Sequence, residues 1–129
     1  GPLSHLRLEP LPGHEQSQRG LVFSDGGGEV WVTGDAVLDQ EWLRAWAYYW
    51  PNRYTVEEIV QTWRSVGRVL ANADLVIPGH GAPFRVTATL LEALLQGFPQ
   101  APHAELCPEL PGLLTSRLLE LENPGRLAV

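Results

Sequence analysis

Three short segments each place a side chain of a metal-binding type directly after glycine. They are Pro12-Gly13-His14, Thr33-Gly34-Asp35 and Pro78-Gly79-His80-Gly81. Glycine lets the backbone turn sharply without a Cβ clash, so the residue that follows it can be presented at the end of a strand rather than inside a sheet. Two imidazoles and a carboxylate suit zinc, and they also suit iron and manganese. Taken together the segments predict a metal site, although each one alone also fits a turn on the surface.

The residues before these segments have the patterns of strands. Apolar and polar residues alternate over residues 6–11, which predicts a half-buried strand. Residues 21–24 and 29–33 predict two strands of a hairpin, because the glycine-rich turn between them permits positive φ angles. Residues 75–77 form a short apolar run that fits a strand buried on both faces. The sequence therefore predicts that His14, Asp35 and His80 each follow a strand.

Four further stretches are predicted to be helical. Apolar residues recur at intervals of three and four over residues 39–50, and Pro51 ends that stripe. Thr55 and Glu58 have the spacing of a capping box, which predicts a helix that continues to about residue 72. Thr89 and Glu92 repeat this spacing and predict a helix as far as Gly97. The fourth helix is expected over residues 113–121.

The length of 129 residues fits one domain with an appended segment. We expect residues 1–97 to form an α+β unit in which a β-hairpin and helices pack on a sheet. Residues 98–129 are expected to form a proline-rich arm and a terminal helix, with no regular structure over residues 98–112.

Composition excludes several kinds of function. All nine basic residues are arginine, so no lysine is present to form a Schiff base or to grip phosphate in a P-loop. The net charge of −6 disfavours nucleic acid as a partner. Cys107 is the single cysteine and predicts neither a disulfide nor a thiolate zinc site, which fits a cytoplasmic protein. No apolar run approaches the roughly 20 residues that cross a bilayer, so we expect no membrane partner.

The three glycine-framed segments, their order and the elements between them resemble the second half of the metallo-β-lactamase fold, from about residue 6 to residue 84. The resemblance implies an αββα sandwich with a site for one or two metal ions, zinc above all, at the edge of its two sheets. It further implies that His14 binds the first metal, His80 binds the second and Asp35 bridges both. The chain is thus expected to be half of such a sandwich.

One part of the superfamily pattern is missing. The His-x-His-x-Asp-His signature, which supplies most of the metal ligands in this superfamily, has no counterpart here, because no two of the four histidines are close in sequence. We therefore expect the isolated chain to be inactive or nearly so. We also expect it to be completed by the N-terminal half of the fold or to associate with a second copy of itself.

An aromatic stripe follows Asp35 and contains Trp42, Trp46 and Trp50. Aromatic residues at helical spacing are most often part of the core. Since this helix is predicted to begin at the metal site, the same three residues are also candidates for an apolar wall that binds substrate.

These observations together predict a metal-dependent hydrolase of the metallo-β-lactamase-like superfamily, with Asp35 as a catalytic residue. Its expected substrate is a small ester, thioester or lactone, attacked by a metal-bound hydroxide. Two alternatives stay open. The chain can be a non-catalytic half-fold that serves interaction or assembly, or it can be part of a di-iron oxidoreductase on the same fold.

Overall fold

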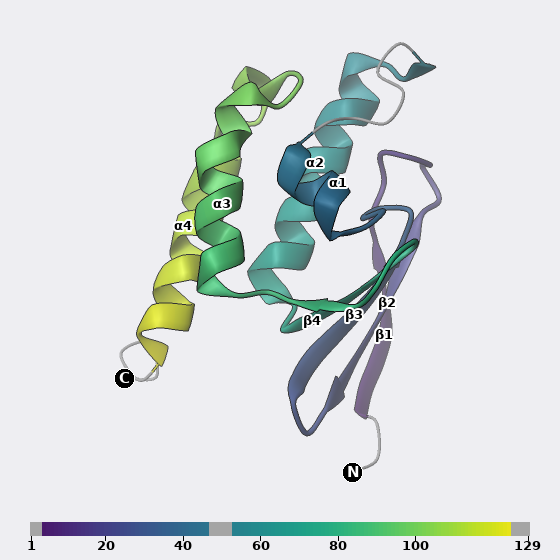
Figure 1. Ribbon diagram of the computed structural model, residues 1–129. Helices are drawn as coiled ribbons and strands as arrows, with labels where there is room; N and C mark the ends of the chain where they lie inside the picture. Colours follow the sequence, from purple (N-terminus) through teal and green to yellow (C-terminus); the bar gives the residue numbers. More distant parts are fainter. Residues whose placement is uncertain (1–3, 47–52, 125–129) are drawn as a thin grey trace.

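The computed structural model describes residues 4–46 and 53–124, which form a sheet of five strands with helices on one face (Figure 1). The strands are β1 (Ser4–Pro10), β2 (Arg19–Asp25), β3 (Gly28–Gly34), β4 (Leu75–Pro78) and β5 (Phe84–Arg85). The mixture of one sheet with helices confirms the predicted α+β class. The sequence did not predict the two-residue strand β5, which is too short to leave a pattern.

The strand order is β1-β2-β3-β4-β5, and the direction of the strands determines where the candidate site lies. Strand β2 is antiparallel to both β1 and β3, whereas β3 and β4 are parallel. Strands β1, β3 and β4 therefore run in the same direction and end at the same edge of the sheet. The residues that follow these three strands are brought together by this topology.

The helices are α1 (Gln40–Ala45), α2 (Val56–Asn72), α3 (Ala88–Gly97) and α4 (Glu109–Glu122). The capping box that begins α2 is confirmed: the Thr55 side chain accepts from the Glu58 amide, and the Glu58 side chain accepts from the Thr55 amide. In the described part of the chain no helix combines the length and the apolar character that a membrane span needs.

Three predictions about the helices need correction. The α3 helix is capped by Thr87, which accepts from the Leu90 amide, and not by Thr89. Residues 98–112 were predicted to lack regular structure, but they contain two 3-10 turns (Phe98–Gln100 and Ala104–Leu106) and the start of α4. Helix α1 ends at Ala45 with Trp46 as its C-cap, and residues 47–50 of the predicted stripe lie outside the described residues.

The core lies between the sheet and the helices, and tryptophan side chains occupy much of it. Three tryptophans are each 1% exposed: Trp31 of β3, Trp46 at the end of α1 and Trp63 of α2. The Trp46 ring meets Trp63 edge-on at 5.3 Å between centroids and meets Phe98 at 4.8 Å. Its indole nitrogen donates to the Leu94 carbonyl at 2.8 Å, so the buried polar atom is satisfied. This packing joins α1, α2 and α3 in one layer.

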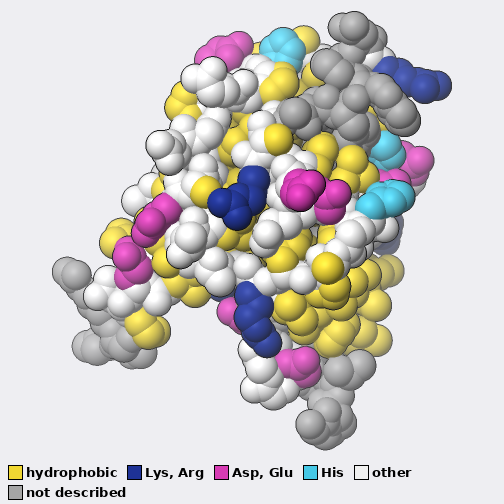
Figure 2. Space-filling view, in the orientation of Figure 1, with side chains coloured by type: hydrophobic (Ala, Val, Ile, Leu, Met, Phe, Trp, Pro, Cys, Tyr) yellow, Lys and Arg dark blue, Asp and Glu magenta, His cyan; other side chains and the backbone are white. Residues whose placement is uncertain are grey.

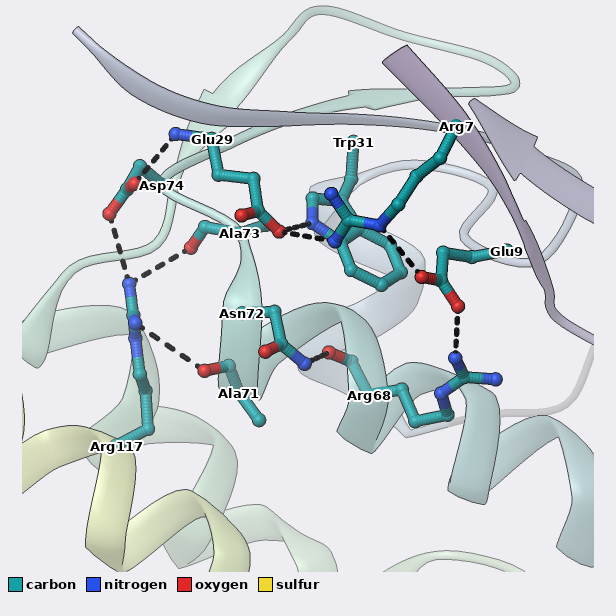
Figure 3. Close-up of polar contacts among 10 residues, drawn as sticks. All are labelled: Arg7, Glu9, Glu29, Trp31, Arg68, Ala71, Asn72, Ala73, Asp74 and Arg117. Carbon is teal, nitrogen blue, oxygen red and sulfur yellow. Dashed lines mark hydrogen bonds and ion pairs between the residues drawn. The ribbon is translucent and has the colours of Figure 1, made fainter. Parts of the chain in front are cut away.

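Charged side chains on the covered face tie the edge strand β1 to the rest of the fold (Figure 3). Arg7 donates to Glu9 at 2.8 Å and to Glu29 of β3 at 3.1 Å. Arg68 of α2 forms an ion pair with the same Glu9. The hydrogen bond from Arg7 holds the pKa of Glu9 below its usual value, and Arg68 adds to this effect. The β1 strand is thus linked by side chains to both β3 and α2.

A second polar cluster, also drawn in Figure 3, attaches α4 to the sheet. Arg117 of α4 donates to the carbonyls of Ala71 and Ala73 at the end of α2, and it pairs with Asp74 at 3.1 Å. The other carboxylate oxygen of Asp74 accepts from the Glu29 amide at 2.8 Å. Residues beyond 97 therefore contribute contacts to the same layered structure, since α4 packs against α2 and α3.

The opposite face of the sheet carries apolar side chains that none of the described helices covers. Leu6, Leu8 and Leu21 are 65%, 59% and 36% exposed. In the strand register Leu8 pairs with Leu21, which pairs in turn with Val32. Paired residues point to the same side of a sheet, so these side chains form one continuous surface, which we call the open face. Figure 2 shows hydrophobic side chains gathered over the strands.

Candidate metal site

Asp35 and His80 are held close together by the parallel pairing of β3 and β4. The register places Gly34 opposite Pro78, so the two chains leave the sheet side by side. A Cβ atom on Gly79 would lie 2.6 Å from the Gly34 carbonyl oxygen and 2.7 Å from Asp35 Oδ1. Neither distance is compatible with a side chain, so glycine is required at position 79 for this close approach. This confirms the structural role that the sequence assigned to the glycine before His80.

The segment after Asp35 also fixes the backbone of His80. The Gly79 amide donates to the Val37 carbonyl at 3.0 Å, and the His80 amide donates to the Leu38 carbonyl at 2.8 Å. These two hydrogen bonds extend the pairing of the strands beyond the end of the sheet. The His80 imidazole is therefore presented from an ordered backbone even though its side chain is 68% exposed.

His14 lies in a loop after β1 that helix α2 holds in place. Within the loop the Leu11 amide donates to the Gln18 carbonyl at 2.8 Å. The Ser65 hydroxyl of α2 donates to the Pro12 carbonyl at 2.6 Å. Gly13 has a φ of +141° and packs directly on Thr62, where any Cβ would overlap the threonine hydroxyl. The glycine before His14 thus allows the loop to lie against the helix.

The three predicted ligands meet at the edge of the sheet. Nε2 of His14 lies 3.6 Å from Asp35 Oδ2, and Nε2 of His80 lies 3.3 Å from Asp35 Oδ1. Each imidazole therefore faces a different oxygen of one carboxylate. The side chains of His14 and Asp35 are 18% and 41% exposed, so the group borders solvent. Figure 2 shows histidine and acidic side chains side by side at this margin of the molecule.

The donor types and the paired distances fit metal binding, but the set is incomplete. Two ligand atoms bound at about 2.1 Å to one tetrahedral zinc ion lie ~3.4 Å apart, which is close to both histidine–aspartate separations. Among the residues that the structure describes, however, no three histidine, cysteine or acidic side chains already surround one point as a metal needs. Each histidine–aspartate pair supplies two donors, so a stable site requires further ligands.

Tyr54 is a neighbour of the site that the sequence did not predict. Its hydroxyl lies 3.1 Å from Nδ1 of His14, on the side of the ring opposite to the nitrogen that faces Asp35. The two rings are 5.7 Å apart between centroids and are tilted by 37°. No pattern in the neighbouring sequence marks Tyr54, because its partner His14 lies 40 residues away along the chain.

The predicted aromatic wall is only partly described. Trp46 is 1% exposed and lies in the core, which favours the core alternative over the substrate-binding one for this residue. Trp42 is half-buried and packs against Trp63 at 6.2 Å between centroids. Trp50 lies outside the described residues. A role of Trp42 or Trp50 in substrate binding stays a prediction.

A shallow cavity of about 260 Å³ adjoins the site and is lined by residues 39–41 and 81–84. Gly81, which follows His80, forms part of its wall.

The single cysteine lies away from the candidate site. Cys107 is buried among core residues, and burial raises the pKa of its thiol to about 11. The thiol is therefore protonated near neutral pH, which disfavours a role as a nucleophile.

Comparison with known proteins identifies relatives of the same kind as the sequence pattern indicated. The chain is 36% identical over 88 residues to metallo-beta-lactamase domain-containing protein 1 of Mus musculus, a match that covers 64% of this chain and 30% of the relative. It is 36% identical over 85 residues to the protein of the same name from Rattus norvegicus, with 64% and 32% covered. No protein-family model matches the chain, and no solved structure matches it.

The chain is therefore related to the metallo-β-lactamase superfamily over part of its length, which confirms the resemblance drawn from the three glycine-framed segments. Its five-stranded sheet with helices on one face is consistent with half of the sandwich of that superfamily. The chain spans about a third of the length of the curated relatives that it matches.

Proposed function

We propose that this chain forms part of a metal-dependent hydrolase that acts on a small ester, thioester or lactone. The observation that carries the proposal is the position of Asp35, whose two carboxylate oxygens each face the Nε2 atom of a different histidine. A carboxylate placed between two imidazoles suits a pair of neighbouring cations, because its negative charge offsets their mutual repulsion.

In this proposal His14, Asp35 and His80 hold one or two divalent ions, with zinc as the first choice and iron or manganese suiting the same donors. A bound ion would supply Lewis acidity and would lower the pKa of a coordinated water to about 7. The chain itself orients the ligands: β3 and β4 fix Asp35 and His80, and α2 fixes the loop of His14. The small cavity beside His80 supports a small molecule as substrate.

The remaining ligands are proposed to come from a second sheet that covers the open face. Two observations support this part of the proposal. The open face is apolar over three neighbouring strands, and each relative is about three times as long as the region it shares with this chain. We therefore propose that the N-terminal half of the fold packs on this face. When that half is absent, a second copy of the chain packs there instead.

The test is the replacement Asp35→Asn in the complete protein, because asparagine keeps the shape of the side chain and removes its charge. We expect kcat to fall by at least ~10²-fold, which corresponds to about 2.7 kcal/mol of lost transition-state stabilisation. The measurement is kcat on a panel of small esters, thioesters and lactones, with excess zinc present. Glu92→Gln, on the exposed face of α3, is the matched control and should leave kcat unchanged.

Near-normal kcat together with full metal content in Asp35→Asn would contradict the assigned role. If the complete wild-type protein binds no metal and hydrolyses none of these substrates, the hydrolase proposal fails and the assembly alternative is favoured.

A further inference from the structure

The two ring nitrogens of His14 have different neighbours. Nε2 faces Asp35 Oδ2 at 3.6 Å, whereas Nδ1 lies 3.1 Å from the hydroxyl of Tyr54. A neutral imidazole carries a proton on only one nitrogen, so the partner of one nitrogen influences which tautomer the ring adopts. The contact with Tyr54 therefore bears on the chemistry available at Nε2.

A phenol hydroxyl suits this position because its oxygen can accept a hydrogen bond as well as donate one. For Nε2 to bind a metal, its lone pair must be free and the ring proton must be on Nδ1. The Nδ1–H group can then donate to the Tyr54 oxygen. A hydrogen bond in this direction would select the tautomer that metal binding needs and would also limit rotation of the ring.

Helix α2 positions both partners of this contact. Tyr54 directly precedes Thr55, the residue whose capping box fixes the first turn of α2. Two to three turns further along, Thr62 packs on Gly13 and Ser65 donates to the Pro12 carbonyl, so the loop of His14 rests on the same helix. The tyrosine and the histidine are therefore fixed relative to each other by one rigid element.

The aromatic ring of Tyr54 is held by more than this hydrogen bond. It is half-buried and packs against the core just before the start of α2. Because this packing holds the ring when the hydroxyl is removed, Tyr54→Phe isolates the contribution of the oxygen atom from that of the ring.

We propose that Tyr54 is a positioning residue for His14, whose hydroxyl accepts from Nδ1–H and thereby directs the Nε2 lone pair toward the metal position. This inference rests on the proposed function, since it assumes that His14 is a metal ligand. It assigns a role to a residue that lies outside the three glycine-framed segments.

The experiment compares the complete protein with its Tyr54→Phe variant and uses zinc as the probe. Competition with a chromophoric chelator should show that the variant binds zinc 10- to 100-fold more weakly, the usual effect of losing such a partner of a metal ligand. Long-range ¹H–¹⁵N spectra of the zinc-loaded protein should show the His14 proton on Nδ1, and the Nδ1–H signal should shift or broaden in the variant. Ser116→Ala removes an exposed hydroxyl on α4 and should change neither quantity.

The outcomes separate this inference from the proposed function. If His14→Ala weakens zinc binding but Tyr54→Phe leaves both the affinity and the Nδ1–H signal unchanged, the metal site stands and the role of Tyr54 is refuted. If His14→Ala itself has no effect on zinc binding, the proposed function fails at this residue. A variant that only loses thermal stability, with the His14 signals unchanged, would show that Tyr54 is merely structural.

Discussion

The two faces of the sheet are built from the same strands but differ in how far this chain completes them. On the covered face Val22, Trp31 and Val76 are at most 1% exposed. On the open face Leu6, Leu8 and Leu21 are 65%, 59% and 36% exposed. Alternation along a strand assigns neighbouring residues to opposite faces, so apolar side chains are present on both. The described helices cover one of these faces and leave the other exposed.

The candidate metal site has the same kind of incompleteness. Its ligands are positioned by ordered backbone, yet Asp35 offers only one carboxylate to two imidazoles, and the described residues complete no metal shell. If the proposed function is correct, the open face and the unfinished ligand set have one cause, which is a second layer of the fold that the described residues do not supply.

The largest effect is expected from a substitution on the covered face. Trp31→Ala should lower the free energy of unfolding by ~3–5 kcal/mol, because it removes a fully buried indole and leaves a cavity. Leu21→Ala, on the neighbouring strand β2 beside Val22, the partner of Trp31, should change it by less than about 1 kcal/mol, since Leu21 is already 36% exposed. Urea unfolding followed by circular dichroism measures both. Equal losses in the two variants would mean that the faces do not differ as described.

Substitutions on the open face should change the association of the chain clearly and its free energy of unfolding only slightly. The isolated chain should self-associate through its apolar strands, and the double variant Leu8→Arg, Leu21→Arg should be monomeric while the unfolding free energy changes by no more than about 1 kcal/mol. Light scattering coupled to size-exclusion chromatography measures the mass. Leu119→Arg, at a leucine of α4 that is 52% exposed, is the control and should associate like the wild type. A wild-type chain that is monomeric at high concentration would argue against an interface on this face.

The sequence predicted those parts of the fold that depend on local patterns. The hairpin of β2 and β3, the capping box of α2 and the short strand β4 are confirmed. The burial predicted for both faces of β4 is not confirmed, because Leu75 and Ile77 are only half-buried and Val76 alone of the three is fully buried. The prediction that Thr89 caps α3 was wrong because Thr87 and Thr89 offer equivalent hydroxyls. The choice of Thr87 follows from its neighbour, since the Val86 amide donates to the Asp74 carbonyl at 3.1 Å and thereby fixes where the chain leaves the sheet.

The prediction of the candidate site has the same limit as the prediction of the fold: both depend on patterns within short segments. The resemblance carried by the three glycine-framed segments predicted that His14, Asp35 and His80 belong to one site, and the structure brings the three side chains together at one edge of the sheet. Tyr54 was missed because its contact with His14 depends on where α2 packs and on nothing in its own sequence neighbourhood. The glycine-framed segments therefore predicted the candidate ligands, whereas Tyr54 became visible as a neighbour of His14 only in three dimensions.

The most direct test of the central claim is the metal content of the complete protein with and without His80. We predict that the wild type contains one to two equivalents of zinc, iron or manganese by elemental analysis. His80→Ala should lose about one equivalent while its unfolding curve, measured without added metal, stays close to that of the wild type, because this side chain is 68% exposed. His103→Asn is the matched control, since asparagine tolerates the left-handed backbone at φ 57° and this histidine is not part of the site. Unchanged metal content in His80→Ala would contradict the account, because it would remove His80 from the site at the edge of the sheet.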